Sequence, residues 1–287
     1  MKYYKIKSYC KINLFLKVIK KLNSGYHNIV SLVTFCNLYD LISISKINAY
    51  KDEINFSGQF SKGIQKKTNT IVNTLNLLRK KKFLGNQAYK INVKKNVPHG
   101  SGLGGGSSNA AALLNYFNLK MGLKIKDKTM EKLANKIGSD VKISLKKRNA
   151  FFTGKNNKIL RINRKFSFDL LIVYPNFICS TKKIYQQNKE SGPLISESFF
   201  YLKNRKKIIN ILKNTNNDLE KTVIKIYPKV KKIINYIKSQ KGCYFSRITG
   251  SGSACIGIFS SKKNAVNAQK LIKSKYPKYW SVVSKTI

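Results

Sequence analysis

The sequence predicts a globular fold in which strands and helices are mixed, and three observations support this prediction. Hydrophobic residues make up 42% and aromatic residues 11% of the 287 positions, a composition typical of chains that bury a core. Segments with a hydrophobic period of two, which indicate strands, are interspersed with segments of helical period. The length is sufficient for one large domain or for two modest domains with cores of their own.

The first third of the chain is predicted to contain three strands and one helix. In residues 9–16 the period of two places Lys11 and Asn13 on one face of a strand and apolar residues on the other. On this pattern alone, the face of Lys11 and Asn13 is either exposed to solvent or part of a site. The other predicted elements are a strand region at 29–44, a short strand at 54–56 and an amphipathic helix at 69–83.

A glycine-rich loop at residues 96–109 connects a predicted strand to a predicted helix. The strand lies at 88–94, and Ser107 or Ser108 is a natural N-cap for the amphipathic helix that follows. Five glycines fall within residues 100–106, so the backbone can approach a ligand closely. The first turn of a helix presents unpaired N–H groups and partial positive charge. The arrangement therefore predicts a phosphate-binding loop.

Three other interpretations of this loop fit less well. A Walker loop requires Gly-Lys followed by Ser or Thr, and no such sequence follows here. Gly100, Gly102 and Gly105 satisfy the dinucleotide-binding pattern G-x-G-x-x-G, but the acidic residue nearest the required distance, Asp127, lies in a polar turn. A turn that merely connects two elements would be weakened by so many glycines.

The second half of the chain is predicted to alternate between helices and strands. Asp127 is expected to cap a helix at 129–137, and polar residues near 163–165 indicate a domain boundary. Further strands are predicted at 149–162 (two, around Gly154), at 168–173, on both sides of the Gly-Ser loop 250–254, and at 280–284. Further helices are predicted at 181–187, at 200–240 with breaks at 214–217 and Pro228, and at 262–274.

The chain carries 57 basic and 11 acidic residues, a net charge of +46. Such a charge attracts polyanions, so nucleic-acid binding is an alternative function. The lysines are spread along the whole length, without a basic arm or a basic helix with interleaved aromatic residues, and nucleic acid is therefore not expected as the main partner. A salt-dependent mobility shift of DNA or RNA without turnover would favour that alternative.

Other simple features argue against membrane, secreted and zinc-binding classes. No apolar run approaches the roughly 20 residues of a membrane span, and the first residues lack the apolar core of a signal peptide. The five cysteines are odd in number and form no C-x-x-C pair, which indicates neither a disulfide framework nor a zinc site. The expected location is the cytoplasm, without a membrane partner.

Several motifs resemble those of the GHMP kinases, a family of small-molecule kinases. Residues 98–108 resemble the family's ATP loop, residues 138–141 its Gly-Ala/Ser-Asp-Val motif, and residues 250–254 its third motif, which packs beside the ATP loop. The resemblance implies an α+β, two-domain fold with the active site in the cleft between the domains. Residues 1–163 would form an N-terminal domain similar to the second domain of ribosomal protein S5, and residues 164–287 a ferredoxin-like C-terminal domain.

Asp140 is the candidate catalytic carboxylate. A kinase that acts on an alcohol benefits from a base or an orienting carboxylate near the hydroxyl. Asp140 follows a Gly-Ser turn and enters an apolar segment, where on pattern alone it is either a helix cap or this carboxylate. Asp40 and Asp169 interrupt apolar strands and are expected at edges. Asp218 and Glu220 stand at a helix start, where acids are often caps.

The resemblance also implies the roles of the catalytic residues and the cofactors. ATP would be the phosphate donor with Mg²⁺, Asp140 the catalytic base and Lys11 its partner. Ser108 is a candidate Mg²⁺ ligand, and the metal ligands are otherwise unassigned. Lys142 stands where the family usually has proline, a departure that would loosen the turn. The residues implied to bind ATP are Pro98, His99, Gly100, Ser101, Gly102, Leu103, Gly104, Gly105, Gly106, Ser107 and Ser108.

The opening segment resembles one branch of the family, whose substrate is a cytidine diphosphate-linked methylerythritol. The pattern is Lys11-x-Asn13-Leu14-x-Leu16 followed by Gly25-Tyr26-His27. In that branch the tyrosine stacks on cytosine and the histidine pairs with its edge, interactions suited to reading a pyrimidine. Residues 180–185 resemble another segment of that branch, although the family's prolines are replaced there. This resemblance implies Tyr185 as a second aromatic residue that stacks on the cytosine. The residues implied to bind the substrate are Asn13, Tyr26, His27, Thr181 and Tyr185.

The implied reaction is ATP-dependent phosphorylation of the 2-hydroxyl of this substrate, in the non-mevalonate route to isoprenoid precursors. A homoserine or mevalonate type of GHMP kinase is the alternative enzyme. It would share the glycine loop but would have no use for Tyr26 and His27 as a base reader. The protein is expected to be a monomer or a weak homodimer.

Overall fold

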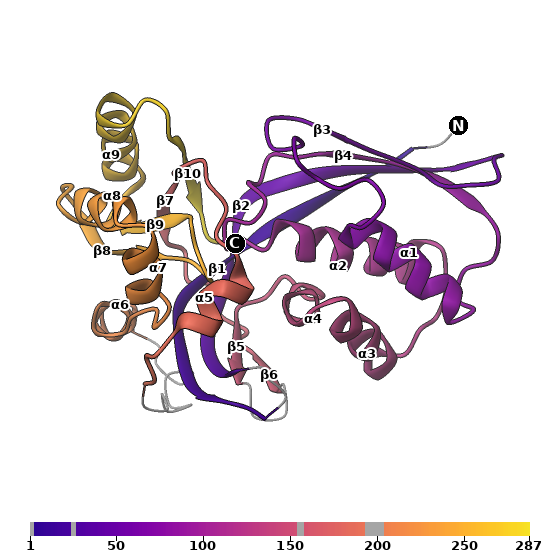
Figure 1. The fold of residues 1–287 in the computed structure, drawn as a ribbon, viewed down its shortest axis with the longest axis horizontal. Helices are drawn as coiled ribbons and strands as arrows, with labels where there is room; N and C mark the ends of the chain where they lie inside the picture. The colour runs from indigo at the N-terminus through magenta and orange to yellow at the C-terminus, as the bar shows by residue number, and fades with distance from the viewer. Residues whose placement is uncertain (1–2, 24–26, 154–157, 193–203) are drawn as a thin grey trace. The chain divides into compact units, whose positions relative to one another are not determined.

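The computed structural model describes residues 3–23, 27–153, 158–192 and 204–287 and is drawn in Figure 1. Its first half contains β1 (Tyr4–Lys21), β2 (His27–Ile47), β3 (Glu53–Ser57), α1 (Thr70–Lys80), β4 (Ala88–Lys94), α2 (Gly105–Lys120), α3 (Asp127–Ile137), α4 (Ser139–Ser144), β5 (Ala150–Thr153) and β6 (Lys158–Arg161). Its second half contains β7 (Asp169–Tyr174), α5 (Thr181–Gln187), α6 (Arg205–Asn214), α7 (Glu220–Ile226), α8 (Lys229–Lys238), β8 (Cys243–Ile248), β9 (Cys255–Phe259), α9 (Lys262–Lys275) and β10 (Trp280–Lys285).

The chain divides into two compact units that are discontinuous in sequence. Unit 1 contains Met1–Lys11, Leu38–His99 and Gly104–Lys147, and unit 2 contains Ile12–Asn37, Gly100–Leu103 and Arg148–Ile287. The long strands β1 and β2 both pass from one unit into the other. These units are not separated by one boundary in the sequence. The division into domains of residues 1–163 and 164–287 stays a prediction. None of the described helices has the length and hydropathy to span a membrane.

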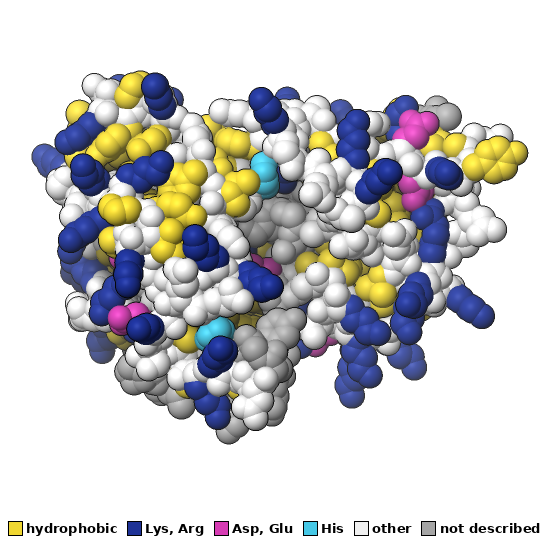
Figure 2. Space-filling view, in the orientation of Figure 1, with side chains coloured by type: hydrophobic (Ala, Val, Ile, Leu, Met, Phe, Trp, Pro, Cys, Tyr) yellow, Lys and Arg dark blue, Asp and Glu magenta, His cyan; other side chains and the backbone are white. Residues whose placement is uncertain are grey.

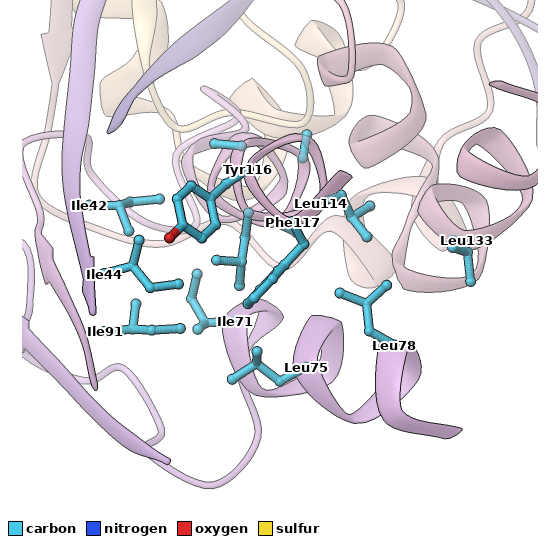
Figure 3. Packing of buried hydrophobic residues seen from close by; sticks show 14 of the residues in the cluster. Ile42, Ile44, Ile71, Leu75, Leu78, Ile91, Leu114, Tyr116, Phe117 and Leu133 are labelled. Carbon is cyan, nitrogen blue, oxygen red and sulfur yellow. The ribbon is translucent and has the colours of Figure 1, made fainter. Parts of the chain in front are cut away.

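Unit 1 packs helices against one face of its strands. β3 is parallel to β4, and β4 is antiparallel to β2, so that Ile91 of β4 lies between Ile54 and Ile44. The buried side chains of β2 and β4 contact those of α1 and α2, as Figure 3 shows. Leu75 of α1 and Phe117 of α2 both belong to this core, where Figure 3 shows Leu75 below Phe117. The helical period of the apolar residues thus produces the buried stripe that the sequence predicts.

The N-termini of α1 and α3 in unit 1 differ in how they are capped. Asn69 caps α1, because its side-chain oxygen accepts hydrogen bonds of 3.0 Å from the N–H groups of Ile71 and Val72. The expectation that Asp127 caps the next helix is wrong. Asp127 is already the first residue of α3, and its carboxylate pairs with Lys146 at 3.1 Å. An acid in the first turn still interacts favourably with the helix dipole.

Unit 2 is built around an antiparallel sheet of order β10-β7-β9-β8. Helices α8 and α9 pack on it, and their apolar residues Ile233, Ile237 and Ile272 join the buried core of the unit. Ser180 and Ser261 cap α5 and α9 by accepting hydrogen bonds from backbone N–H groups. The predicted helices and strands of this region are confirmed where the structure describes them, but Gly154 lies outside the described residues.

The interpretation of Lys11 and Asn13 as a solvent-exposed strand face is wrong. β1 is longer than predicted, and its central residues are buried on both faces. Lys11 is 4% exposed and Asn13 is 5% exposed. A buried lysine requires a charged partner, because desolvation of its ammonium group is costly. The period of two in this strand therefore separates an apolar face from a buried polar one, and the partner of Lys11 belongs to the site.

Candidate active site

The glycine loop leads into α2 without a serine cap, so the predicted cap at Ser107 or Ser108 is wrong. The helix begins at Gly105, and its N-cap is Gly104, with φ 68° and ψ 20°. Within the described residues no side-chain hydrogen bond caps this helix. Ser107 and Ser108 instead lie in the first turn. A helix start without a side-chain cap among the described residues meets the condition under which such a start binds an anion.

Gly104 allows the start of α2 to pack against Lys11. A Cβ atom at position 104 would lie 2.7 Å from Cγ and 2.9 Å from Cε of Lys11, which is closer than real Cβ contacts come. The left-handed backbone at this position also favours glycine. The aliphatic stem of Lys11 consequently runs along the beginning of the helix. Its ammonium group extends to Asp140, with 3.2 Å between Nζ and Oδ2.

Asp140 is held in place by the short helix α4. It lies in the first turn of α4, whose N-cap is Gly138. Its side chain is 39% exposed and is therefore accessible to a substrate. The Ser144 hydroxyl donates to the Asp140 carbonyl at 2.8 Å, and the Ser108 hydroxyl donates to Ser144 Oγ at 3.3 Å. Hydrogen bonds therefore connect the start of α2 to the backbone of Asp140, and Lys11 contacts its carboxylate. Unit 1 brings the predicted catalytic pair together beside the helix start.

The strand that precedes the loop is anchored by Asp40, and the expectation that this residue lies at a strand edge is wrong. Asp40 lies in β2, which pairs with β4 over residues 41–47 and also pairs with β1, and its side chain is completely buried. Its carboxylate accepts hydrogen bonds from the N–H groups of Asn96 and Val97 and from the side chains of Lys95 and Asn109. A buried acid in an apolar strand requires such partners. Asp169 likewise begins an internal strand, β7, rather than an edge strand.

Gly100, Ser101, Gly102 and Leu103 belong to unit 2, where they contact the hairpin between β8 and β9. The Ser101 carbonyl accepts a hydrogen bond of 3.0 Å from the Ala254 N–H group. Gly102 lies so close to this hairpin that a Cβ atom would be 2.0 Å from the Thr249 carbonyl oxygen. The third motif of the sequence, residues 250–254, thus packs beside the glycine loop as its resemblance implies.

Other residues of the predicted ATP loop are buried or contact neighbouring parts of unit 1. Pro98 is buried, and the Nδ1 atom of His99 is buried as well. Nε2 of His99 would lie 3.7 Å from a Cβ atom on Gly63. The Gly106 carbonyl accepts a hydrogen bond of 2.9 Å from the Thr70 hydroxyl at the start of α1. These contacts place the loop in a defined conformation, and its contact with ATP stays a prediction.

Unit 2 brings together two of the residues predicted to read cytosine. The rings of His27 and Tyr185 have centroids 5.1 Å apart and planes at 38°. Burial, and then the charge of Lys21, lower the pKa of His27 below 6.5. Tyr26 lies outside the described residues.

The other two predicted substrate residues are tied to the β8–β9 hairpin. The Thr181 hydroxyl lies 2.8 Å from the Ser251 hydroxyl. The backbone N–H group of Asn13 donates to the Thr249 hydroxyl at 2.9 Å, and its side-chain amide donates to Ser31 at 2.8 Å. Both residues therefore lie next to the third motif, and their contact with a substrate stays a prediction.

The acids at residues 217–220 do not act as the expected caps. Asp218 pairs with Lys17 at 3.0 Å and accepts a hydrogen bond of 2.9 Å from the Val18 N–H group. Glu220 accepts a hydrogen bond of 2.9 Å from the Ile248 N–H group. The amide of Asn217 donates to the Gly250 carbonyl at 2.8 Å. This segment therefore supports β1 and the β8–β9 hairpin.

The basic residues are dispersed over the surface. Figure 2 shows lysine and arginine side chains scattered across the visible face, with few acidic side chains among them. Among the described residues, no group of three or more histidine, cysteine, aspartate and glutamate side chains could hold a metal ion. None of the five cysteines forms a disulfide.

Models of one protein family match two parts of the chain. The model described as GHMP kinases N terminal domain matches residues 69–148, and the model described as GHMP kinases C terminal matches residues 200–278. The first match includes the glycine loop and Asp140. The second includes the 217–220 segment and the β8–β9 hairpin.

Curated relatives match over their full length. A 4-diphosphocytidyl-2-C-methyl-D-erythritol kinase of Pelagibacter ubique is 42% identical, and the match covers 100% of both chains. Kinases with the same name from Caldanaerobacter subterraneus and Wolbachia pipientis are 32% and 33% identical, and these matches cover 99% and 98% of this chain and 96% and 97% of theirs.

Solved structures of several kinases share the fold. A crystal structure of 4-(cytidine 5'-diphospho)-2C-methyl-D-erythritol kinase superposes with a TM-score of 0.77 at 21% identity, over 99% of both chains. Homoserine kinase from Cytophaga hutchinsonii gives a TM-score of 0.68 at 15% identity, over 99% of this chain and 94% of its own. The two-domain architecture that the sequence predicts is thereby confirmed.

The close approach of Gly102 to the hairpin gives a prediction about stability. Gly102 and Gly122 both have positive φ, 82° and 70°, but a Cβ atom on Gly122 would have nothing within 4 Å. Gly122→Ala should therefore cost about 1 kcal/mol of backbone strain. Gly102→Ala should cost roughly 3 kcal/mol or more, because the clash with the Thr249 carbonyl is added. The free energies of unfolding in urea test this difference, and equal costs would contradict the close approach.

Proposed function

We propose that this chain, which belongs to the GHMP kinase family, transfers the γ-phosphoryl group of ATP to the 2-hydroxyl of 4-diphosphocytidyl-2-C-methyl-D-erythritol. The observation that carries the proposal is the Lys11–Asp140 pair beside the glycine start of α2. The full-length identity of 42% to a kinase of that name supports the choice of substrate. The product would be the 2-phosphate, a precursor in the non-mevalonate route to isoprenoids.

The glycine loop would bind the phosphates of ATP. Among the described residues no side-chain hydrogen bond caps α2, and the helix dipole adds partial positive charge to its first N–H groups. The absence of Cβ atoms at Gly104 and Gly105 lets this helix start pack against Lys11 and Val97, which would fix the direction of its N–H groups. The wider set of loop residues from Pro98 to Ser108 would determine the path of the backbone around the nucleotide. This binding mode needs backbone amides rather than a P-loop lysine.

Asp140 and Lys11 would act on the acceptor alcohol. Asp140 is the more exposed of the two and can accept the hydroxyl proton as the oxygen attacks the γ-phosphorus. The bond between the γ-phosphorus and its bridging oxygen breaks, and ADP leaves. Lys11, with its stem against Gly104, places a positive charge between the carboxylate and the helix start. That charge would stabilise the developing negative charge of the transition state.

Mg²⁺ would enter the reaction as the complex with ATP. Magnesium is commonly bound through substrate phosphates and water with few protein ligands, which fits the small set of donors at this site. The Ser108 hydroxyl, buried in the first turn of α2, is the candidate protein ligand. The ion would neutralise charge on the β- and γ-phosphates.

Recognition of the cytidylyl group would fall to unit 2. His27 and Tyr185 are adjacent aromatic rings, and Tyr26 precedes His27 in the chain. Stacking on two rings combined with hydrogen bonds to the base edge distinguishes cytosine from other groups. Thr181 and Asn13 would bind nearby parts of the substrate. A monomer or weak homodimer is still expected.

A substrate panel tests the proposed function against its alternative. Purified enzyme with MgATP should phosphorylate the cytidine diphosphate-linked methylerythritol and should be nearly inactive on methylerythritol 4-phosphate, homoserine and mevalonate. ADP release measures each reaction. A homoserine or mevalonate kinase would show the opposite preference, and activity that ignores the cytidylyl group would contradict the proposal.

Replacement of the proposed base should remove turnover while nucleotide binding remains. Asp140→Asn should lower kcat by about 10² to 10⁴-fold, the usual contribution of general base catalysis, with little change in the affinity for ATP. Asp127→Asn is a matched control, because that carboxylate is 82% exposed and pairs with a surface lysine. Steady-state kinetics and direct nucleotide binding measure both variants. A kcat of Asp140→Asn near that of the wild type would refute the assignment.

The lowered pKa of His27 predicts how substrate recognition depends on pH. The neutral imidazole has one donor and one acceptor, which suits the edge of cytosine, and protonation removes the acceptor. Because the pKa lies below 6.5, KM for the cytidylyl substrate should be constant from about pH 8 to pH 6.5 and should rise only at lower pH. KM for ATP serves as the internal control. A rise in KM for the cytidylyl substrate that begins above pH 7 would contradict this role for His27.

A further inference from the structure

We propose that Asp40 is the positioning residue of the glycine loop, because its single carboxylate holds both ends of the loop together. This inference rests on the proposed function, since its consequence is measured as nucleotide affinity. Asp40 lies on β2, far from the loop in sequence, and the residues that it binds flank positions 98–108 on both sides. It would act through the loop, without touching the nucleotide.

The entry to the loop is bound by one carboxylate oxygen. Oδ1 of Asp40 accepts hydrogen bonds from the N–H groups of Asn96 at 2.8 Å and Val97 at 2.9 Å. The Asn96 side chain donates to the Tyr39 carbonyl at 3.0 Å, next to Asp40 in β2. The backbone therefore turns at a defined point after β4, immediately before Pro98.

The exit from the loop is bound by the other oxygen. Oδ2 of Asp40 accepts a hydrogen bond of 3.0 Å from Nδ2 of Asn109, in the second turn of α2. Lys95 donates to the same oxygen and supplies the compensating charge. A Cβ atom on Gly105 would lie 3.0 Å from Val97 Cγ1 and 3.4 Å from Lys95 Nζ, so the entry of the loop also packs on the beginning of the helix.

The hydrogen bonds of Asp40 with residues 95–97 and Asn109, here called the Asp40 clamp, are buried and therefore favour one loop conformation. Asp40 is 0%, Lys95 2% and Asn109 2% exposed. Breaking any one of these hydrogen bonds would leave a buried polar group unsatisfied, which costs more than a typical hydrogen bond contributes. A buried ion pair adds little to stability against apolar replacements, and one attested use of such a pair is conformational specificity. The Asp40–Lys95 pair would specify the conformation of the predicted ATP loop.

Asp52 provides a matched control within unit 1. Its carboxylate receives two hydrogen bonds from Arg79, at 2.6 and 2.9 Å, and one of 2.9 Å from the Tyr89 N–H group. It therefore combines a basic partner with a backbone amide, as Asp40 does. The groups that it joins are α1 and β4 rather than the glycine loop. Asp40→Asn and Asp52→Asn should both lower the unfolding midpoint.

The test is equilibrium binding of the Mg²⁺ complex of the β,γ-imido analogue of ATP to the full-length protein. Asp40→Asn should weaken binding by about tenfold or more, from the loss of charged hydrogen bonds at the loop, and Asp52→Asn should remain within about twofold of the wild type. KM for the cytidylyl acceptor should be unchanged in Asp40→Asn. Equal analogue affinities in the two variants would overturn the inference. A wild type that binds no analogue would instead refute the proposed function.

A second pair of variants applies if Asp40→Asn does not fold. Asn109→Ala removes one hydrogen bond of the clamp and leaves the Asp40–Lys95 pair intact. Its control is Asn118→Ala in the same helix, where the side chain binds the backbone of Ile125 instead. Asn109→Ala should weaken analogue binding several-fold more than Asn118→Ala at similar stability. Equal binding by the two variants would overturn the positioning role.

Discussion

The start of α2 depends on a steric constraint between two distant parts of the chain. Gly104 adopts a left-handed backbone and lies against the stem of Lys11, where a Cβ atom would not fit. This contact aligns the ammonium group of Lys11 with Asp140 and leaves the first turn of the helix without a side-chain cap. Ser108 and Ser144 connect the same turn to α4. One glycine thus links the proposed phosphate-binding helix start to the proposed catalytic carboxylate.

Most of the few acidic residues that the structure describes are paired. Eight of the ten described acids form an ion pair with a basic partner. Asp40, Asp52 and Asp218 also accept hydrogen bonds from backbone N–H groups and thereby join segments far apart in sequence. Lysine and arginine far outnumber the acids, and their side chains are scattered over the face that Figure 2 shows.

The two compact units contain different parts of the proposed chemistry. Lys11, Asp140 and the first turn of α2 belong to unit 1, whereas His27, Thr181 and Tyr185 belong to unit 2. Phosphoryl transfer needs amides and charges, which unit 1 supplies through helix ends. Recognition of a base needs aromatic surface, which unit 2 supplies. Solved structures of a homoserine kinase and a mevalonate kinase share the fold.

Local sequence was sufficient for most elements and for the candidate site. The strand at 88–94 and the helix at 181–187 have the predicted bounds, because period and turn residues are local signals. The glycine loop, Asp140 and Lys11 were identified from motifs. Tertiary structure alone decided that Gly104 rather than a serine is the N-cap of α2, and that Asp40 is a buried anchor rather than an edge residue. Both outcomes depend on partners distant in sequence, Lys11 for Gly104 and residues 95–97 and 109 for Asp40, and a local pattern contains no information about such contacts.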